Sequence, residues 1–166
     1  MKIAIYPGSF DPVTMGHLNI IERAAQIFDR LVVCVMVNSA KTPMFTREER
    51  VELIRRVTKH LPNVEVDSSD MLLAEYARQK GRCVIVKGLR AGSDFENEFQ
   101  MALINRKINP ELDTMFLTSE HQFTYLSSSM VKELGSYDVD LTDFLPAAII
   151  PDFRKRIEDI RQGGNT

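Results

Sequence analysis

The chain has 166 residues, of which 44% are apolar, enough for one domain with a sizeable core. Its net charge of −2 argues against a general polyanion-binding protein, so any phosphate recognition must be local. No run of about 18 apolar residues is present, which predicts no membrane span, and the start of the sequence does not resemble a signal peptide. Cys34 and Cys83 lie inside apolar runs and are predicted to be buried, reduced thiols of a cytoplasmic protein.

Apolar runs typical of strands alternate with segments of helical spacing along most of the chain. Strands are predicted at 2–6, 31–37, 64–66, 83–86 and 114–117. Helices are predicted at 16–28, from 46 onward, and at 70–80, 93–108, 127–135 and 152–162. This order indicates an α/β fold, a Rossmann-like five-stranded parallel sheet flanked by helices. Residues 1–166 are expected to form a single domain with a C-terminal helical tail from about 141.

The most unusual pattern lies in the first seventeen residues. We expect the stretch Pro7-Gly8-Ser9-Phe10-Asp11-Pro12 neither in a helix nor in a central strand, and helical spacing begins at Leu18. His17 is therefore expected in the first turn of a helix, where free backbone N–H groups and the helix dipole favour an anion. Thr14 would share its face, and Gly16 leaves room for a ligand. In the alternative interpretation, the turn is merely tight and His17 only caps the helix.

The unusual loops all follow predicted strands, and ligands of open parallel sheets bind at the carboxyl ends of strands. Four side chains in these loops are cations or potential cations: His17, Lys41, Lys87 and Arg90. Each alone would usually be a solvated surface charge, but their shared placement predicts a phosphate site. Arg90 can bind a phosphate with two donors, whereas a lysine acts as a point charge. Neither the G-x-G-x-x-G fingerprint nor a Walker lysine is present.

Other residues near these loops have two interpretations each. Ser127 to Ser129 stand at a helix start, which suits either a phosphate tail or ordinary N-capping. Phe123 and Tyr125 have faces on which a base can stack, although core packing is the commoner role. Asp94 and Glu98 lie one helical turn apart, and the sequence alone favours surface acids.

The sequence contains no zinc-type ligand spacing and no G-x-S-x-G nucleophile motif. A phosphate monoester acceptor, with its second pKa near 6, is largely ionised at neutral pH and needs no base in order to attack. The residues therefore suit catalysis by positioning and electrostatics, with Mg²⁺ screening a triphosphate.

Gly8-Ser9-Phe10-Asp11-Pro12 followed by Thr14-Met15-Gly16-His17 resembles the signature of the nucleotidyltransferases with an (H/T)-x-G-H motif. The resemblance is closest to the phosphopantetheine adenylyltransferase family of coenzyme A synthesis. Later segments are similar to that family's other loops: Lys41 to Arg50, Gly88 to Glu98, and Phe123 to Lys132. The resemblance covers almost the whole chain and fades after about Leu145.

The resemblance implies transfer of AMP from ATP to 4′-phosphopantetheine, giving dephospho-coenzyme A and pyrophosphate by in-line attack without a covalent intermediate. Catalytic roles are implied for His17, Lys41 and Arg90. By the same likeness, ATP is held by Ser9, Phe10, His17, Gly88, Leu89, Arg90, Glu98, Phe123, Thr124, Tyr125, Leu126, Ser127, Ser128 and Ser129. Phosphopantetheine is held by Ser9, Lys41, Leu73 and Lys87.

The family also implies a cytoplasmic homohexamer with coenzyme A as a feedback inhibitor. Mg²⁺ would be held mainly by the triphosphate, without protein ligands, and no nucleic acid or membrane partner is expected. Two positions depart from the family pattern. Lys87 stands where many members have arginine, which leaves the affinity for the acceptor open, and Phe123 stands where some have tryptophan.

Two other functions remain as alternatives. The first is an enzyme of the same fold that acts on nicotinate mononucleotide or a polyol phosphate, although nicotinate mononucleotide enzymes tend toward Ser-Ser-Thr with a following arginine. Here the motif is Ser-Ser-Ser-x-x-Lys, at 127–132. The second is a non-catalytic nucleotide sensor or assembly scaffold, which would be free to lose the cations, whereas none of them is missing.

Overall fold

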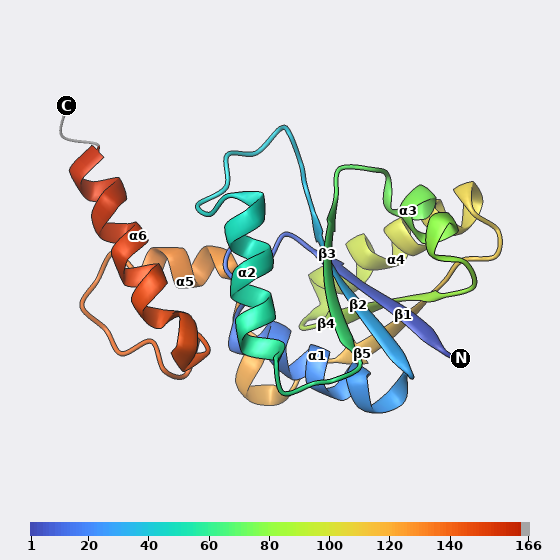
Figure 1. Cartoon of the computed structure of the whole chain (residues 1–166), viewed down its shortest axis with the longest axis horizontal. Helices are drawn as coiled ribbons and strands as arrows, with labels where there is room; N and C mark the ends of the chain where they lie inside the picture. The colour runs from blue at the N-terminus through green and yellow to red at the C-terminus, as the bar shows by residue number, and fades with distance from the viewer. Residues whose placement is uncertain (164–166) are drawn as a thin grey trace.

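The computed structural model describes residues 1–163, and in this part of the chain five parallel strands form one sheet (Figure 1). The strand order is β3-β2-β1-β4-β5, which places β1 at the centre and β3 and β5 at the edges. The strands are β1 (Ile3–Gly8), β2 (Arg30–Met36), β3 (Val64–Ser69), β4 (Val84–Leu89) and β5 (Asp113–Thr118). The predicted parallel, Rossmann-like sheet is confirmed.

Helices connect the strands and cover both faces of the sheet. They are α1 (Met15–Ile27), α2 (Arg47–Thr58), α3 (Leu73–Lys80), α4 (Gly92–Ile108), α5 (Ser128–Leu134) and α6 (Ile150–Gly163). Side chains alternate along the central strands: Tyr6 and Val33 pack in the larger core with α1 and α2, whereas Ile5 and Val32 pack in a smaller core with α3. This two-sided burial explains why residues 31–35 are apolar without interruption.

β1 runs further than the sequence predicted. Pro7 and Gly8 belong to the strand and are in register with β2, with Pro7 opposite Cys34. The expectation that these two residues lie outside a central strand is therefore wrong. The register of β1 with β4 covers only Ala4 and Ile5, so Pro7 lies where β1 has a single neighbour. A missing N–H and a missing side chain are tolerated at such a strand end.

β4 also extends beyond its predicted end, because residues 87–89, expected in a loop, are in register with β5. A Cβ atom at Gly88 would lie 3.1 Å from Cγ1 of Ile20 on α1, so a larger residue there would require the Ile20 side chain to shift. β3 likewise continues to Ser69, so α3 begins at Leu73 rather than at the predicted Asp70.

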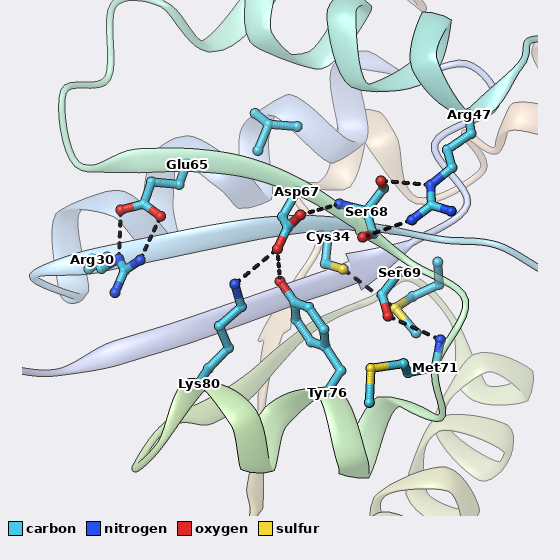
Figure 2. Close-up of polar contacts among 12 residues, drawn as sticks. Arg30, Cys34, Arg47, Glu65, Asp67, Ser68, Ser69, Met71, Tyr76 and Lys80 are labelled. Carbon is cyan, nitrogen blue, oxygen red and sulfur yellow. Dashed lines mark hydrogen bonds and ion pairs between the residues drawn. The ribbon is translucent and has the colours of Figure 1, made fainter.

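The edge strand β3 is tied to α3 through Asp67 (Figure 2). Its carboxylate accepts hydrogen bonds from the Tyr76 hydroxyl at 2.7 Å and from the Lys80 ammonium at 2.9 Å. Burial alone would raise the pKa of Asp67, but these hydrogen bonds lower it to about 2. Cys34 lies beside this group (Figure 2), and both it and Cys83 are buried free thiols, as predicted.

The C-terminal part of the described chain packs onto the larger core beside α2 (Figure 1). Leu145 and Ile149, just before α6, and Phe153 within it are each at most 1% exposed, so this segment is held by burial as well as by polar contacts. Over residues 1–163, none of the helices combines the length and apolar character needed to cross a membrane.

Candidate active site

A cavity of about 530 Å³ lies at the carboxyl ends of β1, β2 and β4. It lies where the strand order reverses between β1 and β4, the usual ligand position in open α/β sheets. Its volume is within the range of about 300–1,000 Å³ typical of small-molecule sites. The sequence-predicted site residues that line it are Ser9, Phe10, His17, Lys41, Lys87, Gly88, Arg90, Glu98, Phe123, Leu126, Ser127, Ser128 and Ser129. Leu73, Leu89, Thr124 and Tyr125 are not among its lining residues.

His17 stands in the first turn of α1, held by its N-cap residue. The Thr14 hydroxyl accepts from the His17 backbone N–H at 3.3 Å, and His17 Nδ1 accepts from the Thr14 backbone N–H at 3.0 Å. The imidazole thus completes a capping box, so the capping interpretation is correct as far as it goes.

The same contact fixes the chemistry of the ring. Burial, together with the positive charges of Arg90 and Lys87, lowers the pKa of His17 to about 3. His17 is therefore neutral at pH 7. Because Nδ1 accepts the Thr14 N–H, the single ring proton is on Nε2. The ring lines the cavity as a hydrogen-bond donor that is already oriented.

The two cations on β4 and just after it are paired with acids of α4. Arg90 donates to both carboxylate oxygens of Asp94, at 2.8 and 3.3 Å, and to the Leu126 carbonyl at 2.8 Å. Lys87 pairs with Glu98 at 3.4 Å. The interpretation of Asp94 and Glu98 as surface acids is therefore wrong, because both line the cavity and hold its cations.

Lys41 belongs to the loop between β2 and α2 and lines the same cavity. Its backbone N–H donates to the Asn38 carbonyl, and its side chain is exposed. Within residues 1–163, the Lys41 ammonium has no hydrogen-bond or ion-pair partner. It is thus a cation whose charge no nearby acid neutralises.

The serines at the start of α5 cap the helix and also line the cavity, while their contact with a phosphate stays a prediction. Ser127 is the N-cap and accepts from the Met130 N–H at 3.1 Å, while Ser128 donates to the Pro12 carbonyl at 2.8 Å. All three serines line the cavity beside the N-terminus of the helix. Phe123 is 8% exposed and belongs to the larger core, so packing is its main role here.

Sequence reasoning missed three charged residues of the cavity: Asp11, Arg50 and Lys132. Asp11 accepts from the backbone N–H groups of Met44 and Phe45, both at 2.8 Å, and from Lys132 at 2.6 Å. Arg50, only 4% exposed, donates to the Ser9 carbonyl at 3.0 Å. An arginine one turn into α2 gives no sequence signal of burial. Asp11 does give one, because an aspartate between two prolines in a turn is unusual enough to suggest a specific role.

Comparison with known proteins places this geometry in a family. A cytidylyltransferase-like family model matches residues 5–134. Over 146 residues the chain is 55% identical to a phosphopantetheine adenylyltransferase from Caldanaerobacter subterraneus subsp. tengcongensis, covering 88% of this chain and 91% of the relative. The chain belongs to the phosphopantetheine adenylyltransferase family. A second member, from Heliobacterium modesticaldum, is 48% identical over 163 residues, which are 98% of this chain and 97% of that protein.

Solved structures of related enzymes share the fold of this family member. A Vibrio parahaemolyticus structure assigned as a nicotinate-nucleotide adenylyltransferase superposes with a TM-score of 0.70 at 19% identity, covering 94% of this chain and 96% of that one. The nicotinic acid mononucleotide adenylyltransferase of Plasmodium falciparum, complexed with NaAD, gives 0.64 at 14% identity, with 96% and 95% covered. The predicted family and the nucleotidyltransferase fold are thus confirmed.

Proposed function

We propose that the chain transfers AMP from ATP to 4′-phosphopantetheine, giving dephospho-coenzyme A and pyrophosphate. The observation that carries the proposal is one cavity at the β1/β4 switch point that gathers a neutral histidine donor, Lys41, Lys87 and Arg90. The names of the relatives that are about half identical over most of the chain support the same acceptor.

In this mechanism, the ionised phosphate of phosphopantetheine attacks the α-phosphorus of ATP in line, and pyrophosphate leaves. Negative charge grows on the non-bridging α-phosphate oxygens as the new bond forms. His17 lines the cavity and its Nδ1 is held by Thr14, so we assign its Nε2–H to these oxygens, where it stabilises the charge without any proton transfer. A ring that stays neutral acts in this way and not as a general acid.

The cations divide the remaining work between the two substrates. Arg90, fixed by Asp94 and the Leu126 carbonyl, presents a rigid guanidinium toward the ATP phosphates beside the Ser127–Ser129 helix start. Lys41 and Lys87, which line the same cavity, bind the acceptor phosphate. Lys87 is already paired with Glu98. Lys41 has no such partner among residues 1–163, so its ammonium is free to approach the acceptor.

Mg²⁺ enters this scheme together with the nucleotide. Among residues 1–163, no three His, Cys, Asp or Glu side chains cluster as a metal-binding group. The acids of the cavity are instead engaged with Lys132, Arg90 and Lys87. This arrangement fits an ion bound mainly through triphosphate oxygens, as is usual for Mg²⁺ in nucleotide sites. There it would screen the triphosphate charge.

We further propose that the protein is a cytoplasmic homohexamer. What supports assembly is the surface of α4, along which large apolar side chains are about half exposed: Phe95, Phe99, Met101, Leu103 and Ile104, at 47–54%. Patches of this kind mark interaction surfaces. Coenzyme A carries the pantetheine arm and the adenine of the two substrates, so we propose that it competes for the same cavity.

The decisive experiment incubates the protein with ATP, Mg²⁺ and one acceptor at a time while pyrophosphate is followed. The acceptors are phosphopantetheine, nicotinate mononucleotide and glycerol 3-phosphate. We expect pyrophosphate release only with phosphopantetheine. Release with another acceptor alone would replace the proposed substrate, and ATP binding without release in any arm would indicate a nucleotide sensor.

A further inference from the structure

The loop between β2 and α2 carries Lys41 into the cavity, yet residues 38–43 are exposed along their whole length. The next two residues, Met44 and Phe45, are half-buried and buried, and we call them the Met44–Phe45 junction. Phe45 is 3% exposed, and Thr46 begins α2 through a capping box with Glu49. The position of Lys41 therefore depends on the contacts that hold Met44 and Phe45 in place.

Arg156 of α6 makes three contacts with the Met44–Phe45 junction and the first turn of α2. Its Nη1 donates to the Met44 carbonyl at 2.6 Å, and its Nη2 donates to Glu49 Oε1 at 2.5 Å. Its guanidinium carbon lies 4.8 Å from the centre of the Phe45 ring, within cation–π range. The Arg156 side chain is only 25% exposed, so water competes little for these contacts.

Asp11 holds the same junction from the inside. It accepts the N–H groups of Met44 and Phe45, and Lys132 of α5 neutralises its charge. Met44 is thus bound on both sides, its N–H by Asp11 and its carbonyl by Arg156. Lys41 stands only three positions before this doubly held residue.

We propose that Arg156 is a positioning residue for the acceptor site, and that α6 acts through it to set where Lys41 stands opposite Lys87. The inference rests on the proposed function, because it assigns the acceptor phosphate to Lys41. Arg156 itself touches neither substrate. It acts through the Met44 carbonyl, the Phe45 ring and the N-cap acid Glu49.

The test compares Arg156→Met with a matched variant of the same helix, Arg154→Met. Arg154 also donates to backbone carbonyls, those of Tyr137 and Val139, but this segment lines no part of the cavity. Methionine keeps much of the aliphatic stem of each arginine. Both variants therefore lose the polar contacts of one α6 side chain, but only Arg156→Met loses the contacts with Met44, Phe45 and Glu49. Steady-state kinetics with ATP and phosphopantetheine, and thermal unfolding, are measured for both.

For Arg156→Met we expect KM for phosphopantetheine to rise about tenfold, because a displacement of about 1 Å from a remote mutation can cost up to about 10²-fold. KM for ATP should stay within about twofold of the parent. Arg154→Met should leave both KM values unchanged, although its melting temperature should be similar to that of Arg156→Met. Equal KM values for phosphopantetheine in the two variants, or equal increases for both substrates, would overturn the proposal. If Arg156→Met does not fold, Arg156→Lys, which keeps the charge but not the planar fork, is judged by the same comparison.

A second measurement separates this inference from the proposed function. Trypsin cleavage at Lys41–Thr42 reports the order of the loop without any substrate. We expect cleavage several-fold faster in Arg156→Met than in Arg154→Met. If the parent does not turn over phosphopantetheine, the proposed function fails, while faster cleavage still shows that Arg156 orders the loop. Parental cleavage together with a parental KM refutes the positioning role alone.

Discussion

Replacement of His17 by alanine tests the proposed transition-state donor and the cap at the same residue. In the folded protein, His17 lines the cavity and its Nδ1 accepts the Thr14 N–H, which leaves Nε2–H as the proposed donor. Loss of one oriented donor to a developing oxyanion typically costs about 10²–10³ in turnover, or roughly 2.7–4 kcal/mol. We expect turnover to fall by at least about two orders of magnitude and ATP affinity to change little, because the donor acts mainly in the transition state.

The same substitution has a separate cost in stability. Thr14 is 1% exposed, so removal of the imidazole leaves its backbone N–H without an acceptor in a buried place. An unsatisfied buried donor costs about 1–3 kcal/mol. For a chain of this size, that loss corresponds to a fall in melting temperature of roughly 2–12 °C. Turnover must therefore be measured well below the melting transition and expressed per folded molecule.

His17→Gln is the matched control. Glutamine at this helix position completes a capping box through its side-chain oxygen, so it should restore most of the melting temperature. It lacks the imidazole geometry, and turnover should remain far below that of the parent. Calorimetry with ATP, unfolding curves and pyrophosphate release separate these effects. If His17→Ala melts much earlier but keeps near-parental turnover per folded molecule, His17 is only a cap and the catalytic assignment moves to Lys41 and Arg90.

The remaining predictions concern the acceptor phosphate and pH. Lys87→Ala should weaken phosphopantetheine binding by about 1.5–3 kcal/mol and leave ATP nearly unchanged, because a hydrogen bond to a charged group is lost; equal losses in calorimetry would contradict this division of roles. Pantetheine without its phosphate lacks the attacking oxygen, so turnover near that of phosphopantetheine would refute the mechanism. His17, with a pKa of about 3, should produce no inflection near pH 6.5 in the turnover profile, and such an inflection lost in His17→Gln would show that the ring titrates at its ordinary pKa of 6.5. The pKa of Asp67 is lowered to about 2 in the folded protein from 3.8, so the unfolded chain binds more protons between these values. Stability should therefore fall as pH drops through that window, and Asp67→Asn should flatten this part of the unfolding profile.

Local patterns predicted the local structure well. The helix predicted from 46 onward is α2, which Thr46 caps in a capping box with Glu49, and Ser127 caps α5, one of the two roles considered for it. These contacts join residues three positions apart, so they depend on little beyond the helix itself. The continuous apolar stretch at 31–35 likewise identified a strand buried on both faces.

The parts that sequence could not predict depend on neighbours brought close by the sheet. Pro7 belongs to a central strand only because the register with β4 ends at Ile5. Asp11 and Lys132 are 121 positions apart, and nothing local in either segment indicates their contact. The same reason explains why Glu98 was read as a surface acid: its partner Lys87 lies on another element. Spacing along the chain carries no information about such pairs.

The composition of the cavity wall has a consequence for the order of events in folding. Its lining residues extend from Tyr6 to Lys132 and come from segments that follow β1, β2, β4 and β5. Parallel strands pair only after long crossovers have closed, which makes such sheets slow to assemble. Each of these strands, or the segment directly after it, supplies part of the cavity wall. In a refolding experiment, far-ultraviolet circular dichroism should therefore recover before substrate binding does, and binding should return only with the last crossover.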